Sequence, residues 1–124
     1  MFRRTVMLSA MAFSLAAPPA QAHHSYAMFD RAKTVTLSGT IREYRWTNPH
    51  SWIQITVPGE GGGTDEWSVE MGSPFELLRV GWTAKTVKAG DRVSIQVHPV
   101  KDGSKGAGFV SGTDAEGHAL GGGK

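Results

Sequence analysis

Two adjacent histidines, His23 and His24, directly follow a segment that resembles a secretory signal peptide. Cleavage after Ala22 makes His23 the first residue of the mature chain, where its α-amine and its imidazole can bind the same metal ion. Copper accepts such a pair together with a second imidazole. Because an α-amine ordinarily has a pKa of roughly 7.7–8.0, the metal must displace a proton, and its affinity should rise with pH. The sequence therefore predicts copper binding at the mature amino terminus.

The third nitrogen of this site must come from elsewhere in the chain. His50 is the first candidate, because Asn48-Pro49 predicts a tight turn that would hold it between two strands. His98 is the second candidate, on the polar face at the end of a later strand, and His24 could replace either of them. His118 is the least suited, because it lies in a glycine-rich tail. The alternative interpretation is that these histidines are structural or contact a partner.

Aromatic residues form a second candidate feature, with four tryptophans in a small chain. In a barrel of the OB type, the outer face of the second and third strands commonly binds ligands. That face could recognise a cell-envelope ligand or a periplasmic protein partner. Alternatively, two of the tryptophans pack around the Asn48-Pro49 turn, and Tyr26 and Phe29 hold the amino-terminal segment over them. The residues expected on this ligand face are Trp46, Asn48, Trp52, Gln54 and Glu70.

Enzymatic activity is not expected. The chain has no cysteine nucleophile and no Ser-His-acid spacing, and the Gly61-Gly62-Gly63 run is followed by neither a lysine nor a helix, as a phosphate-binding loop would be. Asp65, Glu66 and Glu70 cannot be paired as acid and base from their spacing. An oxidative copper enzyme is the remaining enzymatic alternative, and nothing in the sequence indicates a substrate platform for it.

Residues 1–22 predict an export signal. Arg3 and Arg4 give a basic start, residues 6–17 are apolar but shorter than the roughly 20 residues that span a membrane, and Ala20-Gln21-Ala22 matches the small-x-small cleavage pattern. The residues around the two arginines fit a twin-arginine signal poorly. We expect a periplasmic or secreted protein with no membrane anchor once the leader is removed. Cleavage after Ala20 would start the chain at Gln21-Ala22-His23, which can also bind Cu(II) or Ni(II).

Charge and cysteine content restrict the partners and the means of stabilisation. The chain has 13 basic and 11 acidic residues, and subtracting the two leader arginines leaves 11 against 11. A neutral mature chain lacks the basic surface that nucleic-acid binding needs, so we expect no nucleic-acid partner. Without cysteines there are no disulfides. The 102 residues left from 124 after removal of 22 suffice for one small domain.

The mature chain alternates apolar and polar residues in several short segments, which predicts strands. The first covers residues 34–46, where Gly39 and a change of phase after Ile41 predict a bend or bulge. Further strands are expected around residues 52–57, 67–71, 93–97 and 107–111. Ser73-Pro74-Phe75-Glu76 has the residues of a helix capping box, and Gly81 should end that helix.

Three strands, a helix and two further strands form the element order of an OB-fold. We therefore expect an all-β protein with one short helix, built as an OB-fold-like five-stranded barrel. The alternative is a small open β-roll with one helix on a face. The predicted organisation is a signal peptide at 1–22, an amino-terminal segment at 23–33, the barrel at 34–113 and a flexible glycine-rich tail at 114–124, with a hairpin around residues 114–120.

Two motifs resemble those of a known family. The mature start His23-His24-Ser25-Tyr26 and the segment Trp46-Thr47-Asn48-Pro49-His50-Ser51-Trp52 are similar to those of a family of small secreted bacterial proteins of unknown function. Met71, where glycine is usual, and Pro99 depart from the family pattern. The resemblance covers nearly the whole mature chain and implies secretion and a single small β domain, without implying an activity.

Overall fold

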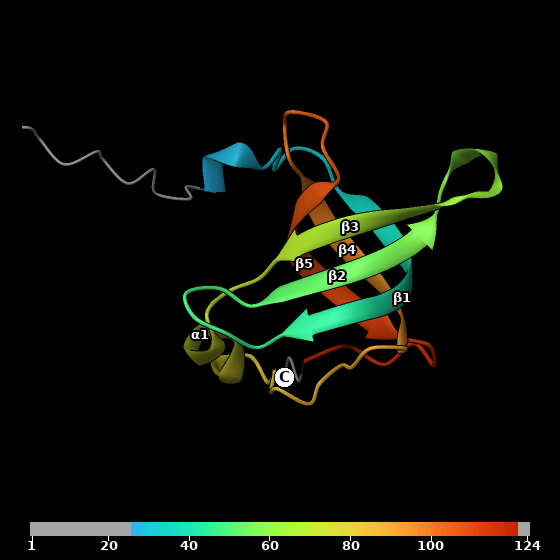
Figure 1. The fold of residues 1–124 in the computed structure, drawn as a ribbon. Helices are drawn as coiled ribbons and strands as arrows, with labels where there is room; N and C mark the ends of the chain where they lie inside the picture. Colours follow the sequence, from blue (N-terminus) through green and yellow to red (C-terminus); the bar gives the residue numbers. More distant parts are fainter. Residues whose placement is uncertain (1–25, 122–124) are drawn as a thin grey trace, which may run out of the picture.

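The computed structural model describes residues 26–121, which form a closed five-stranded barrel with one short helix, as predicted (Figure 1). Neighbouring strands follow the order β1-β2-β3-β5-β4, and only β3 and β5 pair in parallel. Among the described residues, no helix is long and apolar enough to cross a membrane. The strands are β1 (Val35–Arg45), β2 (Trp52–Pro58), β3 (Thr64–Glu70), β4 (Arg92–Pro99) and β5 (Gly106–Asp114), with α1 (Pro74–Arg79) between β3 and β4 and the 3₁₀ turns η1 (Tyr26–Met28) and η2 (Glu60–Gly62).

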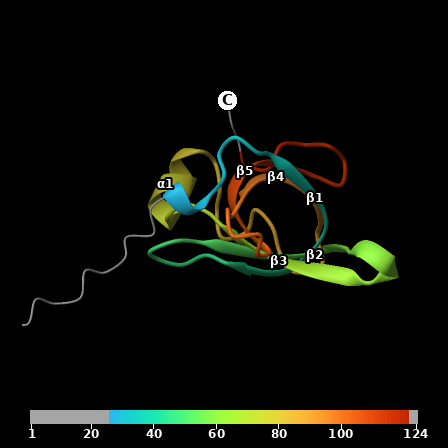
Figure 2. The ribbon, with the colours of Figure 1, turned by 90° about the horizontal axis from the view of Figure 1, so that it is seen from above.

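The core fills the barrel with branched side chains from alternate strand positions. Ile53, Ile55 and Ile95 are fully buried, and Leu77 and Trp82 extend the same apolar cluster at the end where α1 and the following loop lie (Figure 1). Seen from above, the strands form a ring, with η1 and α1 on the same side of it (Figure 2). The predicted alternation thus identifies the inward faces.

The predicted irregularity in β1 is confirmed. The register between β1 and β2 shifts between Ile41 and Glu43. Gly39 lies against β2 so closely that an added Cβ would be 2.0 Å from the carbonyl oxygen of Thr56. Only a residue without a side chain permits this approach of two backbones. One long strand can therefore pair with both β2 and β4.

The predicted capping box of α1 is also confirmed. The Ser73 hydroxyl accepts a hydrogen bond from the Glu76 N–H at 3.3 Å, and the Glu76 carboxylate accepts one from the Ser73 N–H at 2.9 Å. After the helix, Gly81 adopts φ 84°, a left-handed conformation that favours glycine. This turn directs Trp82 into the core.

β5 is longer than predicted and continues into a hairpin. It runs to Asp114, whose N–H donates to the carbonyl of His118 at 2.9 Å. The Leu120 N–H then donates to the Gly112 carbonyl at 2.9 Å, and the Leu120 side chain packs against the core. The hairpin expected around residues 114–120 is therefore present.

Candidate functional site

Phe29 attaches the amino-terminal segment to the barrel. It follows η1, forms a bridge with Val100 just beyond β4, and is only 6% exposed. Next to this bridge, the Asp30 N–H donates to the carbonyl of Pro99 at 2.7 Å. The chain that leads back to the predicted mature start therefore leaves the barrel from a fixed point.

The Phe29 ring lies over Gly108 in the centre of a three-strand surface. An added Cβ at Gly108 would be 3.1 Å from a ring carbon of Phe29, which is tighter than ordinary van der Waals contact. Gly108 pairs with Glu70 of β3 on one side and with His98 of β4 on the other. Because neighbouring strands lie about 4.8 Å apart, the Cα atoms of Glu70 and His98 are separated by about 10 Å. Phe29 therefore lies between these two polar side chains.

His50 contacts Glu70. Nδ1 of His50 lies 2.6 Å from Oε1 of Glu70, and the Glu70 side chain is only 9% exposed. The two groups form an ion pair when His50 is protonated, although Nδ1 is buried and has no partner in aligned hydrogen-bonding geometry among the described residues. No described residue bonds to the other ring nitrogen, Nε2. The arrangement leaves Nε2 available to an added ligand.

His50 also influences the amino-terminal end of α1. The pKa of Glu76 is lowered mainly by the hydrogen bond from the backbone N–H of Ser73 and by the one that involves the Ser73 side chain, and the charge of His50 lowers it further. His50 therefore lies near two carboxylates, one at the end of β3 and one on the helix. Through His50, the loop after β1 therefore interacts electrostatically with the end of β3 and with the start of α1.

His98 has a fixed orientation of a different kind. Its Nδ1 lies 2.8 Å from the backbone carbonyl oxygen of Lys33. A carbonyl only accepts hydrogen bonds, so Nδ1 must carry the proton and the neutral ring keeps its lone pair on Nε2. His98 borders a cavity together with Phe29, whereas His50 does not border that cavity.

The predicted ligand face is largely satisfied by its own contacts. Gln54 is buried and its Nε2 donates to the Ser68 hydroxyl at 2.9 Å, and Glu70 faces His50. Trp52 pairs with Glu70 across the two strands and is half-buried. Trp46 packs against the core instead, with its ring centroid 6.2 Å from that of Tyr44. Asn48, exposed in the loop after β1, is joined to Pro49 by a cis peptide bond.

Of the predicted metal ligands, the structure describes His50 and His98, which lie at different places: His50 against Glu70 and His98 at the cavity. His23 and His24 lie outside the described residues. Within residues 26–121, the only group of three potential ligand residues whose ligand atoms lie close together is Asp114, Glu116 and His118, in the exposed carboxyl-terminal hairpin. Oδ1 of Asp114 already accepts hydrogen bonds from the backbone N–H groups of Glu116 and His118 at 2.9 Å each, and Oδ2 lies 3.2 Å from Nδ1 of His118. This group is a satisfied turn rather than an open ligand set.

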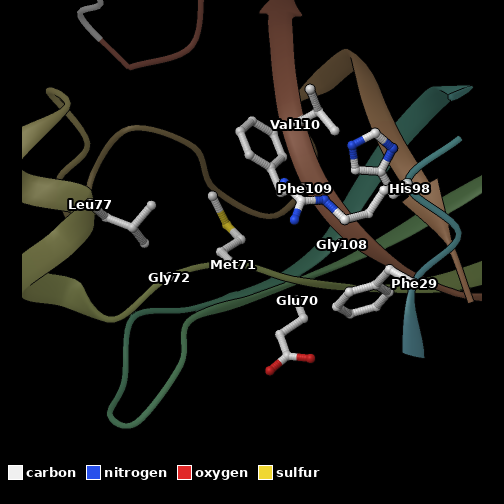
Figure 3. A pocket seen from close by; sticks show the side chains of 10 residues that line it. Phe29, Glu70, Met71, Gly72, Leu77, His98, Gly108, Phe109 and Val110 are labelled. Atoms are coloured by element: carbon white, nitrogen blue, oxygen red, sulfur yellow. The ribbon is translucent and has the colours of Figure 1, made fainter. Parts of the chain in front are cut away.

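A cavity of about 510 Å³ opens beside Phe29 (Figure 3). It forms because β3 and β5 pair only at Ser68–Glu70 and Gly106–Gly108 and then diverge. Sequence reasoning identified Glu70 and His98 on its border but missed Arg31 and Gly108. The glycine spacing Gly106-Ala107-Gly108 was the available signal, because glycine inside a strand often marks a close approach by another group.

The comparisons with known proteins place the chain without assigning it an activity. A family model described as a family of unknown function (DUF6152) matches residues 11–109, which is 99 of 124 residues. No curated protein and no solved structure matches the chain.

Proposed function

We propose that this chain, which belongs to the family of unknown function DUF6152, is an exported protein that binds copper through the amino terminus of its mature form. Removal of residues 1–22 exposes the α-amine of His23, which binds the metal together with the His23 imidazole. His50 supplies the third nitrogen through Nε2. His24 is the alternative donor from the amino-terminal segment.

The contact between His50 and Glu70 is the observation that carries this proposal. Histidines that bind metals usually present the second ring nitrogen to a carboxylate or carbonyl, which fixes the tautomer and makes the ligand more basic. Here a carboxylate that is nine-tenths buried lies 2.6 Å from Nδ1. A metal bound at Nε2 keeps the proton on Nδ1, next to that carboxylate.

The position of Phe29 makes the proposed geometry attainable. Phe29 lies six positions after His23, and the 3₁₀ turn η1 occupies Tyr26–Met28. Because a 3₁₀ turn rises only about 2 Å per residue, this length of chain spans at most about 16 Å. Phe29 and Glu70 border the same cavity, and Glu70 contacts His50. Phe29, which joins the amino-terminal segment to the barrel, therefore lies on the side of the barrel where Glu70 contacts His50.

His98 is a poorer partner for the same ion. Its Nε2 is available, but the Phe29 ring lies between the strand positions of Glu70 and His98. A single ion bound near His50 would have to reach around that ring. We therefore assign His98 to the neighbouring cavity rather than to the copper site.

Copper titration of defined mature chains tests the proposal. Intact mass of the exported protein first establishes whether His23 is the first residue. Acetylation of the His23 α-amine should abolish the high-affinity site, since it removes the amine from the chelate without adding a residue that would place His24 third in the chain. His50→Ala should lower copper affinity strongly, and Glu70→Gln should lower it by about 10–100-fold, as is usual for partners of metal ligands.

Two histidine variants serve as controls. His118→Ala and His98→Ala should leave the affinity unchanged, because neither imidazole lies at the proposed site. Equal affinities in the wild type, the amino-terminally acetylated chain and His50→Ala would refute the site. If His98→Ala, and not His50→Ala, lowers copper affinity, the third copper ligand is His98 at the cavity.

A further inference from the structure

The cavity beside Phe29 has the size and lining of a small-molecule site. Its volume of about 510 Å³ falls within the roughly 300–1,000 Å³ that such sites occupy. The apolar part of its wall comes from separate elements: Phe29 from the amino-terminal segment, Leu77 from α1, and Phe109 and Val110 from β5 (Figure 3). A ligand in this space would contact each of these elements.

The apolar wall is rigid on one side and uncovered on another. Phe109 is held by an edge-to-face contact with Trp82, with ring centroids 5.2 Å apart. Val110 lies at the register shift between β4 and β5 and is 44% exposed. A bulge commonly redirects a side chain, and here it directs an apolar one to the edge of the cavity.

Arg31 gives the polar end of the cavity a cationic character. Within residues 26–121, Arg31 makes no salt bridge, and the neighbouring Asp30 pairs with Lys33 instead. His98 borders the same end of the cavity, with its ring held by the bond from Nδ1 to the Lys33 carbonyl. The opposing charge is directed elsewhere, because the Glu70 carboxylate points away from Phe109 and His98 (Figure 3) and lies against His50.

We propose that this cavity binds a small amphipathic carboxylate. The apolar body of the ligand lies among Phe29, Phe109 and Val110, and its carboxylate meets the Arg31 guanidinium, with the His98 imidazole beside it. The charge of the Arg31 side chain complements an anionic head, and a guanidinium is the group best suited to a carboxylate. This site is separate from the copper site and does not depend on it.

Calorimetric titration of the metal-free mature chain, in the presence of a chelator, tests this proposal. The probe is decanoate, with decanol and decyltrimethylammonium as neutral and cationic probes of equal chain length. Decanoate should bind most tightly and the ammonium most weakly. Arg31→Gln should weaken decanoate binding by about tenfold, since it removes one charge-assisted contact, and should leave decanol binding unchanged.

A matched pair of valine variants locates the binding. Val110→Trp fills the cavity and should lower decanoate affinity by about tenfold or more, whereas Val80→Trp should have no effect. Val80 is similarly exposed, at 54%, but lies at the end of α1 and outside the cavity lining. Thermal melting of each variant confirms folding, and the exposed Arg31 provides a variant with little effect on the core.

Three outcomes would overturn the proposal. Absence of saturable decanoate binding at millimolar concentration would exclude the site. Equal affinities of Val110→Trp and Val80→Trp would place binding elsewhere on the molecule. Equal binding of all three probes, with no effect of Arg31→Gln, would show apolar adsorption without recognition of the carboxylate. A failure of copper binding would leave each of these results unchanged, because no metal is present.

Discussion

Gly108→Ala offers a direct test of how the amino-terminal segment is attached. The new Cβ would meet ring carbons of Phe29 at 3.1 and 3.2 Å, so the ring must move by a few tenths of an ångström. Gly106 is the matched control, two residues earlier in the same strand and on the same face. A Cβ at Gly106 would meet its nearest neighbour, a side-chain methyl of Val100, at 3.5 Å, which is ordinary contact.

The expected stability difference follows from one contact. Neither glycine has a positive φ. Alanine at each position should therefore raise the free energy of unfolding by a similar amount, roughly 0.4–1 kcal/mol, because it reduces the entropy of the unfolded chain. Overpacking costs about 1–3 kcal/mol, and the movable edge of the Phe29 ring favours the lower end. We therefore expect Gly106→Ala to raise the free energy of unfolding. We expect the free energy of unfolding of Gly108→Ala to be about 1 kcal/mol below that of Gly106→Ala.

Urea unfolding of six mature chains measures this difference: the wild type and Phe29→Ala, each alone and with either glycine variant. In a Phe29→Ala background, Gly108→Ala should lose its penalty and match Gly106→Ala, which gives a coupling of about 1 kcal/mol in the double-mutant cycle. Equal stability of the two glycine variants in the wild-type background would refute the packing of Phe29 on Gly108. A penalty that persists without the Phe29 side chain would assign it to the strand backbone instead.

Four further predictions concern the barrel. Ser73→Ala should destabilise the protein by about 1 kcal/mol, because it removes the cap of α1. The hydrogen bonds from Ser73 lower the pKa of Glu76 in the folded protein. The carboxylate therefore stabilises the fold above its unfolded-state pKa, and this stabilisation is lost as the pH falls through the lowered folded-state pKa. In urea unfolding, the stability advantage of the wild type over Glu76→Gln should disappear as the pH falls through these two pKa values. Burial raises the pKa of Tyr44 to about 12, so a spectrophotometric titration should show a late-ionising tyrosine that Tyr44→Phe removes, and the corresponding stability should be lost as the pH rises from about 10 to 12. Gly39→Ala places a Cβ against the Thr56 carbonyl and should cost about 3 kcal/mol in denaturant unfolding; wild-type stability would contradict the close approach.

The elements of the barrel could be predicted because they depend on local signals. Alternation identifies the inward faces, the change of phase after Ile41 marks the bulge, and Ser73 with Glu76 specifies the start of the helix. Each signal lies within a few residues of the structure that it specifies. The sequence predicts that Phe29 holds the amino-terminal segment against the barrel, over the tryptophans near the Asn48-Pro49 turn. Its ring lies against Gly108 instead, and no local signal indicates this contact because Gly108 is far along the chain.

The candidate site could be predicted less completely because it depends on long-range pairing. The contact between His50 and Glu70 follows from the pairing of Trp52 with Glu70, and that register is fixed by the length of the intervening hairpin. The cavity requires the short parallel pairing of β3 with β5, which no alternation pattern encodes. Alternation states which face a residue occupies, and leaves open which residue of another strand lies beside it.

Phe29 borders the proposed cavity and joins the proposed copper-binding segment to the barrel, and this position predicts a coupling between the two sites. Copper binding by the amino-terminal segment would hold Phe29 against Gly108, and the same ring forms one wall of the cavity. A ligand in the cavity would then bind more tightly in the copper-loaded protein, and thermodynamic linkage requires it to raise copper affinity by the same factor. Decanol is the suitable probe, because it does not bind copper in solution. Equal decanol affinities with and without copper would show that the two sites are independent. A copper-induced rise in decanol affinity of more than about fivefold, absent in Phe29→Ala, would identify the Phe29 ring as the element that links the two sites.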